Sequence, residues 1–383
     1  MSERPSVGER AILVGLDFGA DGYPESLDEL RLLALSAGLR IGALVQGRRQ
    51  KPDSALFAGS GKVEEIAAAL QEHSANLVVF NHPLSPAQQR NLEKALDCPV
   101  IDRTRLILDI FAQRARSNEG KLQVELAQLE YASTRLIRGW THLERQRGGR
   151  GVLGGMGETQ LEVDRRLLSD RVKLLKDKMV QFQRRRGVQR KARVRGDVLS
   201  VSLVGYTNTG KSTLFNALTH AGSYAANQLF ATLDTTTRRL YVEGAGNMVL
   251  SDTVGFIREL PHSLVASFRA TLEEAIHADL LLHVVDASSG VRDLQVVQVN
   301  QVLAEIGADA IPQVLVWNKI DLTGIPEGLD RDEYGKIRRV CVSAKTGAGL
   351  GFLRDTLAEA ATLKKSAALN PKSEQEHRNT YVA

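Results

Sequence analysis

The sequence of 383 residues contains only two cysteines, Cys98 and Cys341, and no long hydrophobic run. So few cysteines exclude a disulfide scaffold and a cysteine-ligated zinc site. The longest candidate for a membrane span, residues 280–285, is far shorter than the roughly 20 apolar residues that a membrane helix needs. The chain starts with only a short apolar run, residues 11–16, and has no lipidation motif. We therefore expect no signal peptide, no membrane anchor and a cytoplasmic protein.

Positive charge is concentrated in one part of the sequence. Residues 135–195 contain 18 Lys and Arg against 6 Asp and Glu, which is a net charge of +12, whereas the rest of the chain has a net charge of −7. A basic segment in an otherwise acidic protein favours a nucleic-acid partner, and a solvated helical face is the alternative. The whole chain has 43% hydrophobic and 25% charged residues, a composition typical of a globular protein, and its length suits two to three domains.

The first region, residues 1–120, alternates short apolar runs with helical patterns. The strand-like runs are residues 11–16, 40–45, 77–80 and 99–101, and the helical patterns between them are residues 27–37, 63–73 and 86–96. This alternation predicts a small parallel α/β domain.

The second region, residues 121–195, predicts an α-helical hairpin. Its first apolar stripe is Leu122, Leu126, Leu129, Leu136 and Trp140, and its second is Leu161, Leu168, Val172, Leu175, Met179 and Phe182. The loop between the helices, residues 148–157, has six glycines in ten residues. It either allows close backbone approach to a ligand or is a flexible connection. The arginines around it favour RNA, and the candidate contacts are Arg145, Arg147, Arg150 and Gly151.

The third region, residues 197–364, again alternates strands and helices. The expected strands are residues 198–204, 248–251, 280–285, 314–317 and 339–342. Their continuous apolar character is typical of a mostly parallel sheet that is covered on both faces. The polar residues 366–383 are expected to be disordered.

A phosphate-binding loop of the pattern G-x-x-x-x-G-K-[ST] follows the first strand of this region and precedes a helix at residues 213–219. Its residues are Gly205, Tyr206, Thr207, Asn208, Thr209, Gly210, Lys211 and Ser212, followed by Thr213. Backbone N–H groups of such a loop cradle phosphates. Lys211 is expected to pair with the β- and γ-phosphates of a nucleotide, and the Ser212 hydroxyl to ligate Mg²⁺.

Three further elements follow predicted strands and indicate a guanine nucleotide. Their residues are Asp252, Thr253, Val254 and Gly255; Asn318, Lys319, Ile320 and Asp321; and Ser343, Ala344 and Lys345. Asp252 is placed to help hold Mg²⁺, and the Gly255 N–H to meet the γ-phosphate. The Asp321 carboxylate can accept from both N–H donors of guanine, a pair that adenine lacks, so we expect GTP and GDP as ligands. Ligands of such sheets bind at the carboxyl ends of the strands.

The segment between the phosphate loop and Asp252 has the features of a switch that closes on Mg²⁺ and the γ-phosphate. It begins with Phe230, Ala231, Thr232, Leu233 and Asp234. Thr232 is the first candidate for the switch threonine and Thr236 the second. Many GTPases orient the attacking water with a glutamine after the Asp-x-x-Gly motif, but Phe256 occupies that position here. We therefore expect slow intrinsic hydrolysis that a partner stimulates. Asn208 either helps to bind a monovalent cation such as K⁺ or stabilises its loop.

Together these residues resemble the HflX family of translational GTPases, within the Obg-like group. Two motifs outside the nucleotide-binding domain add to the resemblance, which covers nearly the whole chain. The motifs are Gly-Tyr-Thr-Asn-Thr-Gly-Lys-Ser-Thr-Leu-Phe-Asn from Gly205, Phe-Ala-Thr-Leu-Asp from Phe230, Asp-Thr-Val-Gly-Phe-Ile-Arg-Glu-Leu-Pro-His from Asp252, Gly-Glu-Thr-Gln-Leu-Glu from Gly157, and Leu-Ser-Pro-Ala-Gln-Gln-Arg-Asn-Leu-Glu from Leu84. Met156 departs from the family, which usually has a proline before Gly157.

The resemblance implies an N-terminal α/β domain, a helical hairpin and a GTP-binding domain. It implies binding to the large ribosomal subunit and its RNA, GTP-dependent splitting of stalled ribosomes under stress, and hydrolysis that the ribosome stimulates. It assigns Ser212 and Thr232 to Mg²⁺. We expect Lys211, Thr232 and Gly255 to be the catalytic residues. A ribosome-assembly or RNA-modification GTPase is the alternative. The chain is expected to act as a monomer. A second nucleotide site at residues 59–62 has a simpler explanation as a glycine turn before a helix.

Overall fold

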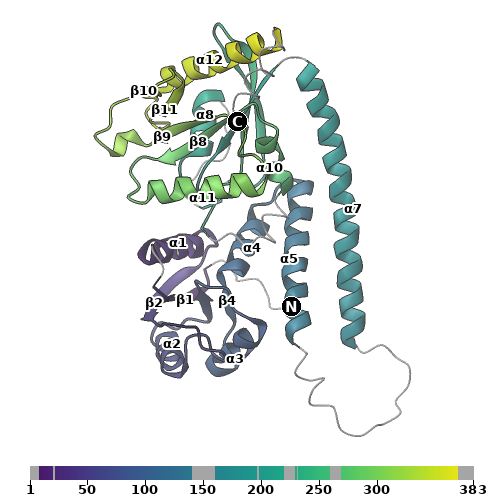
Figure 1. Cartoon of the computed structure of the whole chain (residues 1–383). Helices are drawn as coiled ribbons and strands as arrows, with labels where there is room; N and C mark the ends of the chain where they lie inside the picture. The colour runs from purple at the N-terminus through teal and green to yellow at the C-terminus, as the bar shows by residue number, and fades with distance from the viewer. Residues whose placement is uncertain are drawn as a thin grey trace, which may run out of the picture. The chain divides into compact units, whose positions relative to one another are not determined.

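The computed structural model describes residues 8–19, 22–139, 160–195, 198–219, 229–230, 232–258 and 269–369. The described residues up to Phe182 form one compact unit, and those from Gln183 onward form a second. Each unit has its own sheet and its own hydrophobic core (Figure 1). Among these residues, no helix is both long enough and apolar enough to cross a bilayer.

The first unit is built on a four-stranded parallel sheet. The strands are β1 (Arg10–Asp17), β2 (Arg40–Arg48), β3 (Leu77–Phe80) and β4 (Val100–Asp102), in the order β2-β1-β3-β4. The helices are α1 (Tyr23–Ser36), α2 (Ser60–Glu72), α3 (Pro86–Leu96) and α4 (Arg103–Arg114). The predicted parallel α/β domain is thereby confirmed. The sequence reasoning missed α4, which follows β4 without a turn because Asp102 caps it by accepting from the Arg105 N–H at 2.9 Å.

The predicted helical hairpin is also present, and its residues up to Phe182 belong to the first unit. It consists of α5 (Asn118–Gly139) and α7 (Gln160–Arg195), which lie side by side in Figure 1. Of the predicted stripes, Leu126, Leu175 and Met179 are buried. Five further members are partly buried, namely Leu122, Leu129, Leu168, Val172 and Phe182. Between the helices, Trp140, the glycine-rich loop 148–157 and the RNA-contact candidates Arg145, Arg147, Arg150 and Gly151 lie outside the described residues.

The second unit is built on a seven-stranded, mostly parallel sheet. In chain order its elements are β5 (Leu199–Val204), α8 (Lys211–Thr219), β6 (Thr236–Val242), β7 (Gly246–Asp252), α10 (Arg269–Ile276), β8 (Leu280–Asp286), α11 (Arg292–Glu305), β9 (Gln313–Asn318), the 3-10 helix η1 (Ile320–Leu322), β10 (Gly328–Arg331), β11 (Ile337–Cys341) and α12 (Leu350–Leu369). The strand order is β10-β11-β9-β8-β5-β7-β6. The predicted fold class is thereby confirmed.

Two strands and the start of the C-terminal tail differ from the sequence expectation. The edge strands β6 and β10 were not predicted, because both pair antiparallel at the sheet edges and expose half of their side chains, so neither has a continuous apolar run. Helix α12 continues to Leu369, so residues 366–369 are helical and not disordered as expected. Residues 370–383 lie outside the described part of the chain.

The two faces of the second sheet differ in polarity. Alternate residues of β5 and β8, such as Leu203 and Leu282, join α8 and α12 in an apolar core. On the opposite face lie the buried side chains of Ser202 and His283, and among the described residues neither the Ser202 hydroxyl nor His283 Nδ1 has a hydrogen-bond partner. Burial, and to a smaller degree the charge of Lys211, lowers the pKa of His283 to about 4. The folded protein therefore holds this imidazole neutral.

His283 makes the second unit sensitive to acid. An unfolded histidine binds a proton near pH 6.5, whereas folded His283 does so only near pH 4, so its share of stability is lost as the pH falls through this window. The share is about 3 kcal/mol from the difference in pKa. We expect His283→Gln to remove this loss. The measurement is urea unfolding between pH 7 and pH 4, followed by Trp317 fluorescence in a Trp140→Phe background. Parallel pH profiles for the unmodified protein and the His283→Gln variant would contradict the prediction.

Candidate nucleotide site

The phosphate loop joins β5 to α8 at the carboxyl end of the sheet. A side chain at Gly210, whose φ is +91°, would place its Cβ 2.3 Å from Nδ2 of Asn318. A Cβ on Gly255 would lie 2.9 Å from both Lys211 Nζ and the Thr207 Cα. Only glycine fits at both positions. A side chain at Gly210 would collide with the Asn318 side chain, and one at Gly255 would collide with the phosphate loop.

Lys211 is buried at the centre of this arrangement. Its ammonium donates to the carbonyl oxygens of Tyr206 at 2.7 Å and Gly205 at 3.1 Å. Burial lowers the pKa of Lys211 to about 8, and the nearby Asp252 carboxylate opposes this shift. A buried ammonium without a full counter-charge is suited to receive an anion such as a phosphate.

Three oxygen-bearing side chains converge beside Lys211. Ser212 Oγ lies 2.6 Å from Thr232 Oγ1, and Asp252 Oδ2 accepts from Ser212 at 2.7 Å and from Thr232 at 3.0 Å. Asp252 Oδ1 is buried and has no partner among the described residues, and burial raises the pKa of this carboxyl group. Among the residues that the structure describes, no group of three or more His, Cys, Asp or Glu side chains is arranged to hold a metal ion. One carboxylate with two hydroxyls suits Mg²⁺, which completes its shell with water and substrate phosphates.

The base-recognition segments form the other end of the site. Asn318 ties them together, because its amide donates to the Thr209 carbonyl at 2.8 Å and accepts from the Ala344 N–H at 2.9 Å. Asp321 accepts from the Ser343 hydroxyl at 2.7 Å. Residues far apart in the sequence are thereby held around one space, as the order of the motifs predicted.

A cavity of about 580 Å³ connects the two ends, within the usual size range of small-molecule sites. Most of the predicted nucleotide-binding residues line it. The lining residues are Thr207, Asn208, Gly210, Lys211, Ser212, Thr213, Phe230, Thr232, Thr253, Gly255, Asn318, Lys319, Asp321, Leu322, Ala344 and Lys345. The predicted residues that do not line it are Gly205, Tyr206, Thr209, Leu233, Asp234, Asp252, Val254, Ile320 and Ser343. Ala231 lies outside the described residues.

The structure separates the two candidates for the switch threonine. Thr236 is the first residue of β6 and pairs with Asp252 in the strand ladder, whereas the Thr232 hydroxyl contacts both Ser212 and Asp252. The Phe256 side chain is only 2% exposed. Its main chain bonds to the phosphate loop, donating to Gly205 O at 3.1 Å and accepting from Thr207 N at 2.7 Å.

Sequence reasoning missed two residues of the site, Leu322 and Asp286. Leu322 lines the cavity one position after the Asn-Lys-x-Asp motif. Asp286 ends β8, and its Oδ2 accepts from Lys319 Nζ at 2.7 Å, while its Oδ1 accepts from the Ser288 N–H at 3.0 Å and hydroxyl at 2.6 Å. It therefore fixes the side chain of Lys319, which lines the cavity. The available signal was an acid directly after the apolar run 280–285.

A mostly parallel sheet, a phosphate loop and the guanine-type segments at its carboxyl end define a P-loop GTPase. Residues 200–319 match a family described as 50S ribosome-binding GTPase. Residues 24–112 match the GTP-binding GTPase N-terminal family, and residues 114–193 match the GTP-binding GTPase middle region. The chain belongs to the GTPase HflX family.

Two relatives and one solved structure illustrate this membership. GTPase HflX of Escherichia coli (strain K12) is 54% identical over 360 residues, which cover 94% of this chain and 84% of that protein. GTPase HflX of Magnetococcus marinus is 48% identical over 363 residues, with 94% and 84% covered. A crystal structure of SsGBP in complex with GDP has a TM-score of 0.51 at 23% identity and covers 93% of this chain and 99% of that one. This last likeness supports the fold alone.

Proposed function

We propose that this GTPase binds the large ribosomal subunit in its GTP-bound state and uses hydrolysis to leave it, splitting stalled ribosomes under stress. The observation that carries the proposal is the combination in one chain of a guanine-nucleotide site with a strongly basic helical hairpin. We call this hairpin, made of α5 and α7, the basic arm. The 50S ribosome-binding description of the matched family supports the choice of partner. Ribosomal RNA is the natural ligand for the positive charge.

The nucleotide would bind along the 580 Å³ cavity, with its phosphates at Lys211 and its guanine at Asp321. Mg²⁺ would be held by Ser212, Thr232 and Asp252, whose oxygens already lie within 3.0 Å of one another. When bound, the ion supplies charge stabilisation to the phosphates. Lys211 places a positive charge at the same phosphates, and the Gly255 N–H, beside Lys211, is the proposed γ-phosphate sensor.

The described lining of the cavity has no glutamine that could orient the attacking water, and Phe256, at the usual position of that glutamine, is apolar and buried. We propose that the ribosome supplies or orders the missing group. Asn208 lines the cavity with φ of +60°. Its proposed role as a ligand for K⁺ predicts faster turnover in K⁺ than in Na⁺ at equal ionic strength, whereas a role in loop stability predicts no difference.

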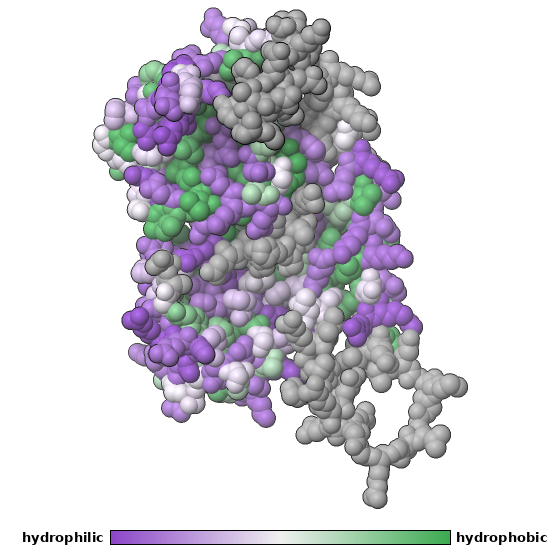
Figure 2. Space-filling model, viewed as in Figure 1, coloured by the Kyte–Doolittle hydropathy of each residue, from purple (hydrophilic) through white to green (hydrophobic). Residues whose placement is uncertain are grey.

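The basic arm is the proposed contact to ribosomal RNA. On the described part of α7, most of the lysines and arginines are exposed, and Figure 2 shows the outer face of this helix as mostly hydrophilic. The exposed basic residues are Arg165, Arg166, Arg171, Lys173, Lys176, Lys178 and Arg184. The two pairs to α5, Arg171–Glu125 and Lys176–Glu130, involve side chains with substantial exposure, so phosphates can approach these cations from solvent.

The proposal is tested by GTP turnover with and without purified large subunits, with ATP as the specificity control. We expect stimulation by large subunits of about 100-fold, the size typical of one missing catalytic group. Retention on subunits with a non-hydrolysable GTP analogue but not with GDP is the matching binding result. Tight GTP binding without stimulation would contradict the proposal. Sucrose gradients of stalled ribosomes then test splitting; a defect confined to subunit maturation would favour an assembly factor.

A further inference from the structure

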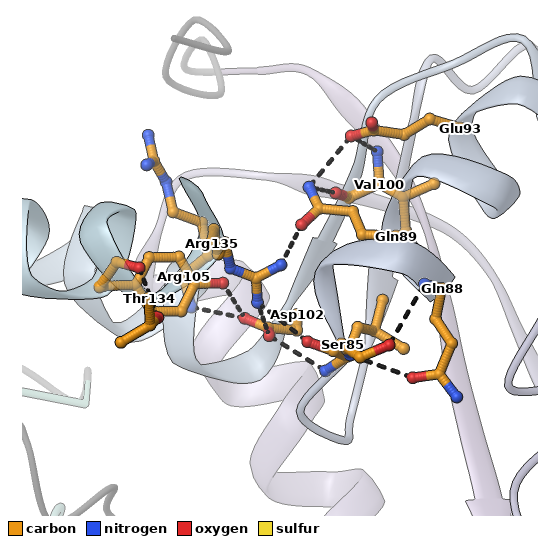
Figure 3. A network of polar contacts seen from close by, with 11 residues as sticks. Ser85, Gln88, Gln89, Glu93, Val100, Asp102, Arg105, Thr134 and Arg135 are labelled. Atoms are coloured by element: carbon orange, nitrogen blue, oxygen red, sulfur yellow. Dashed lines mark hydrogen bonds and ion pairs between the residues drawn. The ribbon is translucent and has the colours of Figure 1, made fainter. Parts of the chain in front are cut away.

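The carboxylate of Asp102, at the end of β4, joins the α/β part of the first unit to the hairpin. Its side chain is 1% exposed and accepts four hydrogen bonds. Two come from the backbone of the α/β part, the N–H groups of Arg105 at 2.9 Å and Leu84 at 3.2 Å. The other two come from α5, the Tyr131 hydroxyl at 2.8 Å and Arg135 Nη2 at 2.5 Å (Figure 3). The carboxylate is therefore shared between the sheet and the arm.

Arg135 has further partners on the α/β side. Its guanidinium donates to the Leu84 carbonyl at 3.2 Å and to the Gln89 side-chain oxygen, and it lies 4.3 Å from the centre of the Tyr131 ring. Gln89 is held in turn by Glu93 at 3.0 Å and by the Val100 carbonyl at 2.8 Å. We name this set of contacts between Arg135, Tyr131, Asp102, Leu84 and Gln89 the arm latch.

The arm latch gives a structural role to the motif that begins at Leu84, whose residues do not line the nucleotide cavity. Ser85 caps α3 reciprocally with Gln88, and this cap presents Leu84 and Gln89 to Arg135. A planar guanidinium with several partners fixes direction as well as distance, whereas apolar packing tolerates rotation of a helix about its axis. The motif therefore supplies two hydrogen-bond acceptors, on Leu84 and Gln89, for the Arg135 guanidinium of α5.

We propose that Arg135 is a positioning residue for ribosome-dependent GTP turnover, because the arm latch sets the direction of the basic arm. This inference rests on the proposed function. Arg135 lies in the last turns of α5, which ends at Gly139. The ion pairs of α7 to α5 at Arg171 and Lys176 are exposed and worth about 0–1 kcal/mol each. The buried leucine and methionine side chains of the hairpin add apolar packing, which does not fix the rotation of a helix about its axis. The buried contact between Arg135 and Asp102 therefore fixes the direction of α5 relative to the α/β part of the first unit.

The test compares Arg135→Gln and Arg135→Lys with the matched control Arg105→Gln. Arg105 is 22% exposed, pairs with the buried Asp109 at 3.0 Å and makes no contact with α5 among the hydrogen bonds described, whereas Arg135 is 19% exposed. Each substitution to Gln leaves one buried carboxylate without its arginine, so both are expected to lower stability similarly. Only loss of Arg135 should free the arm.

For Arg135→Gln we expect the large-subunit concentration that gives half-maximal stimulation to rise about tenfold, which corresponds to about 1.4 kcal/mol of lost pre-organisation. Arg135→Lys, which keeps the charge but not the fork of donors, should lie between Arg135→Gln and the unmodified protein. Turnover without subunits and GDP affinity should not change in any of them. Arg105→Gln should match the unmodified protein in stimulation.

A second measurement reads the arm directly. Spin labels at Glu64→Cys on α2 and Lys173→Cys on α7, in a Cys98→Ala, Cys341→Ala background, report the distance between the α/β part and the arm; both labelled positions are exposed. We expect a narrow distribution in the otherwise unmodified protein, a broad one with Arg135→Gln and a narrow one with Arg105→Gln. An unchanged distribution with Arg135→Gln overturns the inference, as does an equal loss of stimulation in the control. A protein that subunits do not stimulate at all overturns the proposed function itself, and this inference with it.

Discussion

Replacement of Asp321 with asparagine is expected to lower the affinity for GTP about a thousandfold and to create affinity for XTP. In the proposed binding mode the carboxylate accepts from the two N–H donors of guanine, and each of its oxygens can do so while Oδ1 also receives the Ser343 hydroxyl at 2.7 Å. An asparagine offers one acceptor and one donor, so one guanine N–H faces an N–H group and stays unpaired. Leaving a desolvated donor unpaired accounts for losses of about 10³ or more. Xanthine, which has a carbonyl in place of the exocyclic amine, matches the new pattern.

Isothermal titration of nucleotide-free protein with GDP and XDP measures this exchange, and turnover of GTP and XTP confirms it. Asp293→Asn is the control for charge, because Asp293 has a side chain that is 92% exposed on α11 and lies away from the cavity. It should leave both affinities unchanged. If Asp321→Asn lost GTP affinity without gaining XTP, the carboxylate would act on the fold of the loop and not on the base.

Replacement of Lys211 with methionine is expected to lower GTP turnover about a thousandfold, the usual effect of removing a preorganised charge from the transition state. The same change should make the nucleotide-free protein more stable. Burial lowers the pKa of Lys211 to about 8, which means that the folded state disfavours its charge at neutral pH. Methionine matches the lysine side chain up to Cε but lacks the ammonium, and it relieves that cost, worth about 1–3 kcal/mol.

The carbonyl oxygens that Lys211 contacts do not lose their last partner in this variant. Gly205 O also accepts from the Phe256 N–H at 3.1 Å, and Tyr206 O from the Thr209 hydroxyl at 3.0 Å. Thermal unfolding without nucleotide and single-turnover hydrolysis are the two measurements. Lys336→Met, at an exposed position on the β10–β11 turn, should change neither. A Lys211→Met protein that is both inactive and less stable would show that the ammonium is needed for folding of the loop.

Motifs at strand ends made much of the site predictable. The phosphate loop follows β5, and Asp252 and Asn318 are the last residues of β7 and β9. Parallel topology brings the carboxyl ends of these strands to one edge. The choice between Thr232 and Thr236 needed coordinates, because two hydroxyls four residues apart are chemically alike. The contacts of the Thr232 hydroxyl with Ser212 and Asp252, and the position of Thr236 in the β6–β7 ladder, distinguish them.

Contacts between distant positions were the part that sequence reasoning could not reach. Arg135 and Asp102 are 33 residues apart, on a helix and at a strand end, and no local pattern relates them to each other. Asp286 meets Lys319 because β8 and β9 are neighbours in the sheet. Such pairs depend on which elements pack together, and periodicity within one element contains no information about that.

The position of Phe256 has a consequence for timing. Its backbone is bound to the phosphate loop on both sides while its side chain is buried, so this residue fastens two segments of the site together and offers no polar group to the attacking water. If a partner supplies the missing group, as proposed, the lifetime of the GTP-bound form is not fixed by this chain alone. The concentration and accessibility of that partner then set the duration of each cycle.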